Sequence, residues 1–294
     1  MIKVDYKHVD VFSAQPLSGN GLIVFETQAP LAAELMQRLT QEMRQFESIF
    51  LVPADRPGCF RARVFTMEEE LPFAGHPLLG AASILHDRYQ PSDLTATWIL
   101  ELSGSRSVRL ATRKMNGGFR AEMDQGIASF GPALPRPKTT EILQALGLNE
   151  HDLARDLALQ QVSTGLPYLI VPVAGGLERA RIRHSQFEGL LAQVGAKFVY
   201  VLDVDQCEGR TWDNLGLVED VATGSAAGPA AAYLTRHGLL RPAEWVSLHQ
   251  GRFVGRPSVI LTRVEVMGSD PSADELRVHV AGDVCLIASG TVEF

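Results

Sequence analysis

Glu47 is a carboxylate that the sequence places where it could perform acid–base chemistry. It lies between Phe46 and Ile49, where a predicted helix ends and an apparently buried strand begins. Burial among apolar side chains raises the pKa of a carboxyl group toward neutrality, so that the group can both accept and donate a proton. An exposed glutamate that caps the strand fits the same pattern, and the residues alone leave both interpretations open.

Two further segments place polar side chains in front of an apolar helix. His76 follows Gly75 and precedes the apolar stretch Leu78–Leu85, where an imidazole could donate a proton to a substrate or shuttle one. Asp220 and Ser225 flank a similar loop, so an acid and a hydroxyl could converge on one cleft. Because histidine, aspartate and serine also stabilise helix starts, the structural alternative stays open for each of them.

Other kinds of site have no supporting motif. The 8 histidines form neither HxH nor HExxH, and the adjacent carboxylates Glu68–Glu70 point in different directions, as in a solvated turn, so we expect no metal site. Glu70 is nevertheless close enough to Gly75 to contribute indirectly. Gly224 and Ser225 stand outside any GxxxxGK[ST] or GxSxG pattern, and no GxGxxG follows the first strand, so we expect no nucleotide cofactor.

Hydrophobic periodicity predicts the elements that position these residues in the first half. Leu31, Leu35, Leu39 and Met43 recur every four residues, which is typical of an amphipathic helix. Leu78–Leu85 is apolar on every side and predicts a buried helix with Pro77 in its first turn. Alternating or apolar runs predict strands at Tyr6–Phe12, Leu22–Phe25, Ser48–Val52 and Arg61–Thr66.

The same order returns in the second half at a spacing of about 148 residues. The matching segments are a strand at Pro167–Val171, a helix at Glu178–Val194, a strand at Phe198–Leu202, the run Arg210–Trp212, and the loop Glu219–Ser225 before the apolar Ala226–Leu234. Gly238 is a suitable stop for that last helix. The chain therefore contains two copies of one unit, each with a loop that opens onto a buried helix.

Two such halves facing each other would bring both helix amino termini to one cleft, where backbone amides can hold an anion such as a substrate carboxylate.

The stretch Gln125–Lys138 has the glycine and proline content of an inter-domain linker. We therefore assign residues 1–124, with about 279–294, to a first domain that carries Glu47 and His76. Residues 125–278 form a second domain that carries Asp220 and Ser225.

Composition sets the class of protein. The 294 residues are 46% hydrophobic and 21% charged, which fits a packed chain long enough for two domains. The net charge of -7 has the wrong sign for binding nucleic acid. Three widely spaced cysteines, an amino terminus without a signal sequence, and no apolar run of roughly 18 residues favour a cytoplasmic protein that does not enter a membrane.

These motifs together resemble the phenazine-biosynthesis F-type (PhzF-like) isomerases, relatives of diaminopimelate epimerase, over nearly the whole chain. The resemblance rests on Val9–Phe12 with Gly19–Asn20, Glu47 before a short strand, Phe65–Thr66 with Glu70–Pro77, Glu219–Ala226, Gln250–Gly251 and Gly255–Ser258. It implies an α/β (α+β) fold of two similar, pseudo-symmetric halves. Each half would be a curled, mainly antiparallel sheet or barrel around a central helix, with the active site in the cleft between them.

The resemblance also implies roles for particular residues. Glu47 would be the general base that moves a proton between two carbons, with His76 and Asp220 as catalytic partners. Substrate binding would fall to Asn20, Gly75, Gly224 and Ser225. The implied enzyme is a cofactor-independent isomerase of a small carboxylated, cyclic substrate such as a hydroxylated dihydroanthranilate, and the family suggests a homodimer. An epimerase or isomerase of another amino-acid-like substrate, and a binding protein that has kept the fold, are the alternatives.

The chain departs from the family pattern at two positions. Val221 and Gly21 stand where the family usually has proline, which affects loop stiffness more than chemistry and bears on substrate identity. Ala74 and Thr223 stand where cysteine-dependent epimerases of the same fold carry their thiols. We therefore expect no racemisation by two thiols.

Overall fold

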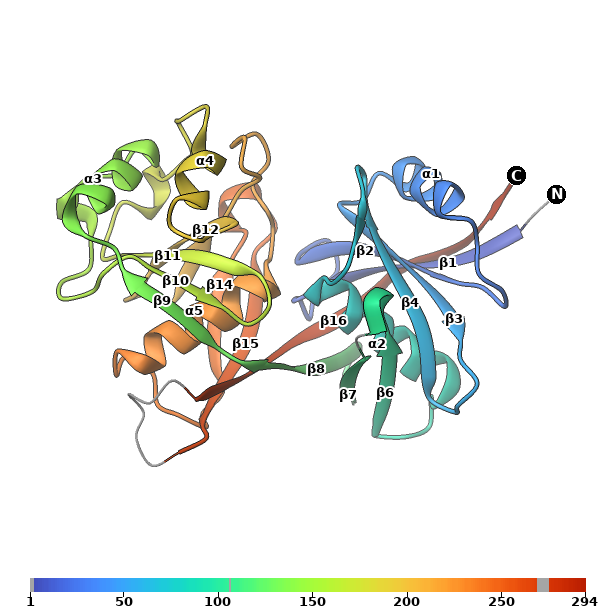
Figure 1. Ribbon diagram of the computed structural model, residues 1–294. Coiled ribbons are helices and arrows are strands. Elements are labelled where there is room, and N and C mark those ends of the chain that lie inside the picture. The colour runs from blue at the N-terminus through green and yellow to red at the C-terminus, as the bar shows by residue number, and fades with distance from the viewer. Residues whose placement is uncertain (1–2, 106, 269–274) are drawn as a thin grey trace. The chain divides into compact units, whose positions relative to one another are not determined.

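The computed structural model describes residues 3–105, 107–268 and 275–294 (Figure 1). The chain divides into two compact units, of which unit 1 contains residues 1–124 and 281–294 and unit 2 contains residues 125–280. The chain passes from one unit to the other inside two strands, β8 (Gly118–Ile127) and β16 (Leu276–Glu293). Among the helices of the described residues, none is long and apolar enough to cross a membrane.

Unit 1 is a closed ring of strands. Its sheet runs in the order β1, β2, β3, β4, β6, β7, β8, β16, and β16 also pairs with β1 in antiparallel register, which closes the ring. The short strand β5 pairs with β4 beside it. The strands besides β8 and β16 are β1 (Lys3–Val11), β2 (Asn20–Glu26), β3 (Glu47–Pro53), β4 (Cys59–Thr66), β5 (Glu70–Leu71), β6 (Thr95–Glu101) and β7 (Ser107–Met115).

The helix α2 (Gly75–Tyr89) lies inside this ring, and every residue from Gly75 to His86 is buried. It contacts β1, β2, β3, β6 and β7. Small residues make this packing fit, since a Cβ added to Gly80 would lie 2.5 Å from Cδ2 of Leu22 on β2. The amphipathic helix α1 (Ala33–Met43) covers the other face of the sheet through a cluster that includes Ile23, Phe25, Met36, Leu39 and Phe50.

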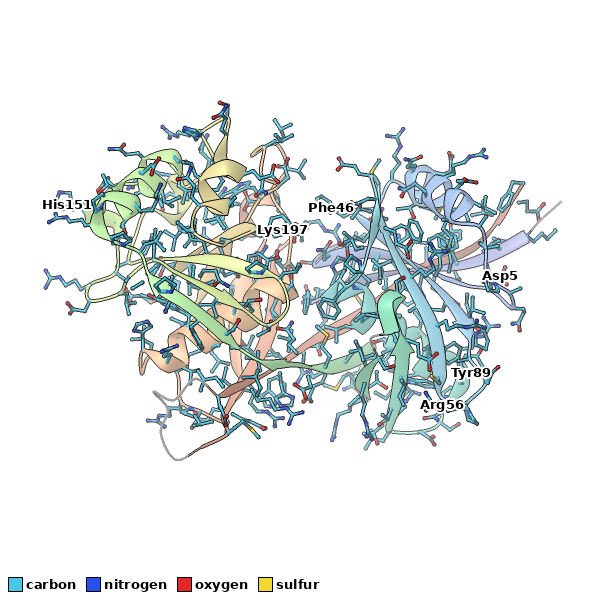
Figure 2. The ribbon with its side chains drawn as sticks, viewed as in Figure 1. Asp5, Phe46, Arg56, Tyr89, His151 and Lys197 are labelled. Atoms are coloured by element: carbon cyan, nitrogen blue, oxygen red, sulfur yellow. The ribbon has the colours of Figure 1, made fainter. Side chains whose placement is uncertain are left out.

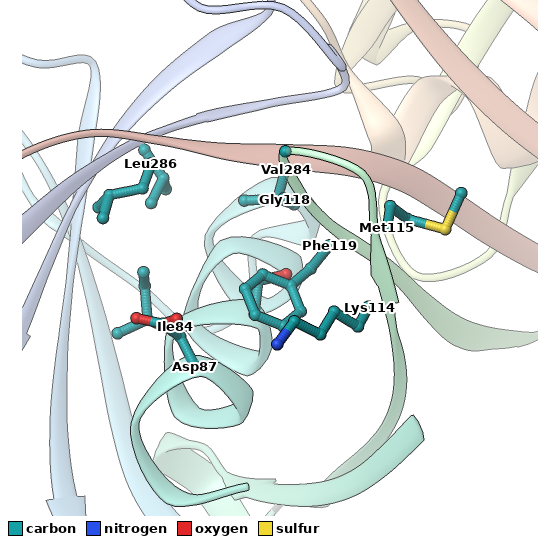
Figure 3. Close-up of a pocket in the computed structure, with 11 residues that line it drawn as sticks. Ile84, Asp87, Lys114, Met115, Gly118, Phe119, Val284 and Leu286 are labelled. Carbon is teal, nitrogen blue, oxygen red and sulfur yellow. The ribbon is translucent and has the colours of Figure 1, made fainter. Parts of the chain in front are cut away.

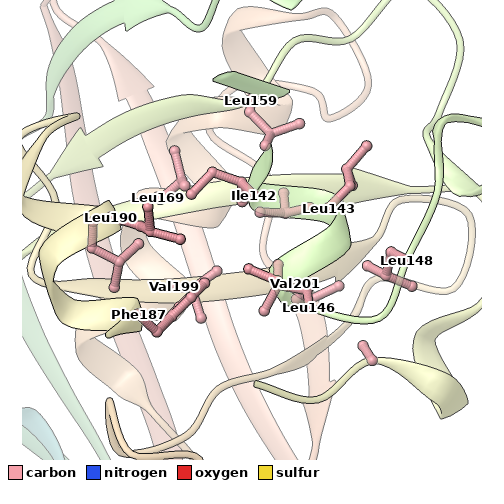
Figure 4. Packing of buried hydrophobic residues seen from close by; sticks show 14 of the residues in the cluster. Ile142, Leu143, Leu146, Leu148, Leu159, Leu169, Phe187, Leu190, Val199 and Val201 are labelled. Carbon is pink, nitrogen blue, oxygen red and sulfur yellow. The ribbon is translucent and has the colours of Figure 1, made fainter. Parts of the chain in front are cut away.

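Unit 2 repeats this plan around α5 (Gly224–Arg236), which is buried at nearly every position. The sheet runs from β16 through β15, β14, β13, β12, β11 and β10 to β9. Its strands are β9 (Ser129–Ala133), β10 (Gln160–Ser163), β11 (Pro167–Val173), β12 (Phe198–Asp203), β13 (Glu208–Arg210), β14 (Val246–Gln250) and β15 (Ser258–Val266). A second core, formed by residues such as Ile142, Phe187 and Val201, packs α3 (Arg136–Ala145) and α4 (Phe187–Ala192) onto this sheet (Figure 4).

Strand directions confirm the predicted repeat. In unit 1, β2 pairs with β3 in parallel, β3 with β4 antiparallel, β4 with β6 in parallel and β6 with β7 antiparallel. In unit 2, the same directions follow for β11 with β12, β12 with β13, β13 with β14 and β14 with β15. The prediction of two similar halves, each a curled sheet around a central helix, is therefore confirmed.

The predicted linker at Gln125–Lys138 is wrong as a description of local structure. The segment holds the end of β8, all of β9 and the start of α3. Its prolines are tolerated because β9 ends the sheet order and because a helix accepts proline in its first turn. The units nevertheless divide at residues 124 and 125.

The long helix predicted at Glu178–Val194 is also wrong. The chain forms a 3₁₀ turn at Leu177–Arg179 and then the short helix α4. Between them, the backbone N–H groups of Arg181 and Arg183 donate to the carbonyls of Leu146 and Ala145 at the end of α3. These bonds take the place of helical ones. Further 3₁₀ turns lie at Ser103–Ser105, Glu150–Asp152 and Arg252–Val254, the last in the hairpin between β14 and β15.

Candidate active site

Glu47 is the first residue of β3 and faces α2. It pairs with Leu22 on the parallel strand β2, and Leu22 packs against Gly80 of α2. Residues paired across neighbouring strands point to the same face of a sheet, so the carboxylate faces the helix. Its side chain is 12% exposed, whereas the preceding Phe46 is 46% exposed (Figure 2). The alternative of an exposed glutamate therefore does not hold.

His76 is the second residue of α2 and meets Glu47 directly, with Nδ1 3.5 Å from Oε2 of the carboxylate. Burial lowers the pKa of His76 from 6.5 to about 3, so the ring is neutral at physiological pH and the contact is polar rather than an ion pair. Within the described part of the chain, no hydrogen-bond partner reaches its buried Nε2 atom. A buried ring nitrogen without a partner is one that a bound molecule can satisfy.

The depressed pKa of His76 makes stability depend on pH. Between pH 6.5 and about 3 the unfolded chain binds a proton at His76 that the folded protein excludes. The contribution of the neutral His76 ring to the free energy of unfolding is therefore complete above pH 6.5 and is lost as the pH falls toward 3. As the pH falls through this range, we expect the free energy of unfolding to decrease in both the wild type and His76→Gln. The slope should be steeper in the wild type by up to about 1.4 kcal/mol per pH unit. Urea unfolding at pH 7, 6, 5 and 4 measures this difference.

His151 supplies the control, because it is an exposed histidine in unit 2 (Figure 2). His151→Gln should keep the wild-type dependence on pH. Parallel curves for the wild type and His76→Gln would show that the buried ring has no part in the acid sensitivity.

The two central helices begin in the same way. The N-cap residue is Ala74 for α2 and Thr223 for α5, and neither side chain caps its helix. The first backbone N–H groups of an α-helix have no intrahelical acceptor, and the positive end of the helix dipole favours an anion there. Gly75 and Gly224 are the first residues of these helices.

Asp220 and Ser225 each take a hydrogen-bonding role at the start of α5. The hydroxyl of Thr223 donates to Oδ2 of Asp220 at 2.5 Å, so this aspartate does not cap the helix itself. Ser225 Oγ lies 2.8 Å from the hydroxyl of Tyr168 on β11, and either oxygen can be the donor. Within unit 2 the structure thus brings together Asp220, Thr223, Gly224 and Ser225.

Tyr168 is a candidate that the sequence patterns did not single out. It is 3% exposed and lies near the start of β11. Asn20, the candidate in unit 1, is 3% exposed and begins β2, the strand that corresponds to β11. Asn20 and Tyr168 are separated by the repeat spacing of about 148 residues, so the repeat could have indicated Tyr168 as the counterpart of Asn20.

An arginine–glutamate pair holds the loop before each central helix. Arg63 of β4 makes two hydrogen bonds to Glu70, which also accepts one from Ser103, and Arg63 lowers the pKa of the Glu70 carboxyl. Arg210 of β13 binds Glu219 in the same two-pronged way and is almost fully buried. Glu70 therefore forms an ion pair with Arg63. Among the described residues, no group of three histidine, cysteine, aspartate or glutamate side chains could hold a metal ion.

A separate hollow of about 310 Å³ lies at the other end of α2 (Figure 3). Its lining includes Ile84 and Asp87 of α2 and Lys114 and Phe119 of the β7–β8 hairpin. Neither Glu47 nor His76 lines it. The hollow is therefore distinct from the candidate site in unit 1.

Comparison with known proteins adds the relatives of this chain. A family model described as phenazine biosynthesis-like protein (PhzC-PhzF) matches residues 9–290. The chain is 33% identical over 298 residues to a trans-2,3-dihydro-3-hydroxyanthranilate isomerase of Pseudomonas chlororaphis, with 98% of each chain covered. It is 49% identical to a solved structure of a predicted epimerase from Pseudomonas aeruginosa, with a TM-score of 0.90 and 99% of each chain covered. A PhzF-family protein from Bacillus anthracis, 22% identical over the full length of both chains, has the same fold with a TM-score of 0.85.

Proposed function

Because this chain belongs to the phenazine biosynthesis-like family and is one of its isomerases, we propose that it moves a proton, and with it a double bond, within a small carboxylated substrate. The observation that carries the proposal is the contact between the Glu47 carboxylate and the neutral ring of His76 at the start of α2. A carboxylate that is mostly shielded from water beside an unionised imidazole is suited to take up and return a proton.

The proposed reaction is balanced within the substrate. Glu47 takes a proton from a carbon atom, the electrons of the broken C–H bond shift across the neighbouring double bond, and the protonated Glu47 returns the proton to the far end of that system. No electron is gained or lost, so the reaction needs no redox cofactor. His76 would hold a substrate oxygen through a hydrogen bond from or to its buried Nε2 atom.

The substrate we propose is a hydroxylated dihydroanthranilate or a related cyclic carboxylate. The support is the relative from Pseudomonas chlororaphis, whose name gives trans-2,3-dihydro-3-hydroxyanthranilate as its substrate. Backbone amides at Gly75 and Gly224, together with Ser225 and Asn20, would bind the carboxylate and the hydroxyl group. Asp220 is proposed as a further residue that acts on the substrate.

Incubation of the protein with trans-2,3-dihydro-3-hydroxyanthranilate in heavy water tests this function. We expect the substrate to be consumed, with a shift of its ring double bonds and with solvent deuterium at carbon in the molecules for which protonated Glu47 exchanges with solvent before it returns the proton. Conversion of another unsaturated or amino-acid-like carboxylate from a panel, with none of this compound, would favour the alternative substrate class. Clear binding of such acids, measured by calorimetry, without turnover of any would favour a binding protein and contradict the proposal.

Tyr168 gives a prediction for substrate affinity. Tyr168→Phe removes the hydroxyl that holds Ser225 Oγ, so we expect KM to rise about threefold to tenfold with a smaller change in kcat, since one hydrogen bond contributes about 0.5–1.5 kcal/mol. Steady-state kinetics measures both constants. Tyr233→Phe is the matched control, because the Tyr233 hydroxyl donates to the carbonyl of Ala158. An equal rise of KM in both variants would contradict a specific role for Tyr168.

A further inference from the structure

Gln250, the last residue of β14, is 1% exposed and makes four hydrogen bonds with its side-chain amide. Nε2 donates to the carbonyl of Asp220 and to the hydroxyl of Thr223, each at 2.9 Å. Oε1 accepts from the backbone N–H of Thr223 at 3.2 Å and from the hydroxyl of Tyr200 at 3.3 Å. Three of the four bonds therefore go to the loop that precedes α5.

The orientation of this amide follows from its partners. A backbone N–H can only donate, so the atom that faces the N–H of Thr223 must be the amide oxygen, and the NH₂ group must face the Thr223 hydroxyl. An amide NH₂ cannot accept, so the Thr223 hydroxyl accepts from Gln250. Its single hydrogen is then directed to the nearest remaining acceptor, Oδ2 of Asp220, at 2.5 Å.

We propose that Gln250 and Thr223 are positioning residues for Asp220, and that they form a one-way series of donors that ends on its carboxylate. The series fixes one carboxylate oxygen and favours the charged form, because a hydrogen bond donated to a carboxylate stabilises its negative charge. It also engages the Thr223 hydroxyl, so that this position does not exchange protons with a substrate. The catalytic role of Asp220 that these two residues support rests on the function proposed above.

The turn after Gln250 supports the same loop. Gly251 has a φ of +86°, and a Cβ at this position would lie 2.3 Å from the carbonyl oxygen of Arg256 and 2.5 Å from that of Val221. The backbone at Gly251 thus packs directly against the loop between Asp220 and Thr223. Contacts from Gln250 and Gly251 therefore hold the backbone of this loop at Asp220 and Val221.

The series belongs to unit 2. In unit 1 the N-cap position of α2 is Ala74, which has no hydroxyl to pass a hydrogen bond onward. Unit 1 instead places the Glu47 and His76 pair beside its helix start. The two units therefore differ in chemistry: one offers a group that exchanges a proton, and the other offers a carboxylate held in a fixed, charged state.

The test uses two variants that alter the series at different points. Thr223→Val keeps the branched shape but removes the hydroxyl, and Gln250→Glu replaces the donor of the series with an acceptor. We expect the carboxyl of Asp220 to be protonated at higher pH in both variants than in the wild type, by about one pH unit. Thr223→Ser, which restores the hydroxyl, should titrate as the wild type does.

The measurement is an NMR titration of the ligand-free protein with ¹³C-labelled aspartate, in which Asp220→Asn identifies the signal of Asp220. Thr235→Val is the matched control, since the buried Thr235 hydroxyl donates to the carbonyl of Ala231 within α5. An unchanged titration of Asp220 in folded Thr223→Val, or in folded Gln250→Glu, would overturn the proposal. Because no substrate is present, this result is independent of whether the proposed function holds.

Steady-state kinetics, with a substrate that the protein converts, gives a second test of the series through kcat and KM. We expect kcat to fall about tenfold to a hundredfold in Thr223→Val, with the acidic limb of the pH profile displaced to higher pH and KM changed by less than threefold. Thr223→Ser should recover most of kcat. A fall in kcat that Thr223→Ser does not rescue would contradict the series and indicate a packing defect.

Discussion

Replacement of Glu47 by glutamine is expected to lower kcat by a factor of about 10³ or more while the protein stays folded and still binds a substrate-like carboxylate. Glutamine has the shape of glutamate and its amide oxygen can still face Nδ1 of His76, but it cannot accept a proton from carbon. Acid–base catalysis by one positioned group contributes a factor of about 10² to 10⁴ to the rate, and the proposed reaction uses the same group twice. Steady-state rates, with calorimetric titration of an unreactive cyclic carboxylate, measure the two properties separately.

Glu69→Gln is the matched control for this experiment. Glu69 is exposed, and its backbone carbonyl accepts a hydrogen bond from the N–H of Thr66, a contact that does not involve the side chain. Its variant should turn over substrate at the wild-type rate. Turnover at that rate by Glu47→Gln would remove Glu47 from the mechanism, and loss of binding together with turnover would assign it a binding role instead.

The second large effect concerns stability and comes from Glu219. Its side chain and that of Arg210 are each 9% exposed, and the Arg210 guanidinium also donates to three backbone carbonyls and lies over the rings of Trp212 and Phe253. Glu219→Ala would leave this cation buried without its counter-ion, which costs about 3–5 kcal/mol. We expect a loss of that size in the free energy of unfolding, measured by urea denaturation.

The corresponding pair in unit 1 provides the comparison. Arg63 and Glu70 have the same two-pronged geometry, but their side chains are 35% and 29% exposed. Water can solvate Arg63 when its partner is removed, so Glu70→Ala should cost only about 1 kcal/mol. Equal losses in the two variants would show that burial of Arg210 does not determine the effect.

Much of the fold could be predicted because the central elements carry strong local signals. The strand that starts at Glu47 is an uninterrupted buried run, and the helix that starts at Gly75 is apolar on every side because it lies inside a ring of strands. The repeat in the sequence then duplicated these assignments. The signals failed where the backbone bonds to a distant segment, as at Arg181 and Arg183, whose N–H groups reach the end of α3.

The candidate site was predictable only in part, for a related reason. A pattern can locate the strand start that carries Glu47 and the helix starts beside His76, Asp220 and Ser225, and the structure places each residue there. Tyr168 and Gln250 reach the same helix start from strands that lie 57 and 27 residues away along the chain. Such contacts depend on strand order and register, which hydrophobic periodicity does not specify.

The pairing of β1 with β16 has a consequence for how the chain folds during synthesis. The strands that close unit 1 come from opposite ends of the sequence, with Lys3 opposite Glu293 and Val11 opposite Val284. Unit 2 is one continuous stretch, residues 125–280, so all of its strands are made before the last segment, whereas the ring of unit 1 stays open until residues 281–294 have been added. The half that is made first is therefore completed last, and the helix that bears His76 gains its full enclosure only then.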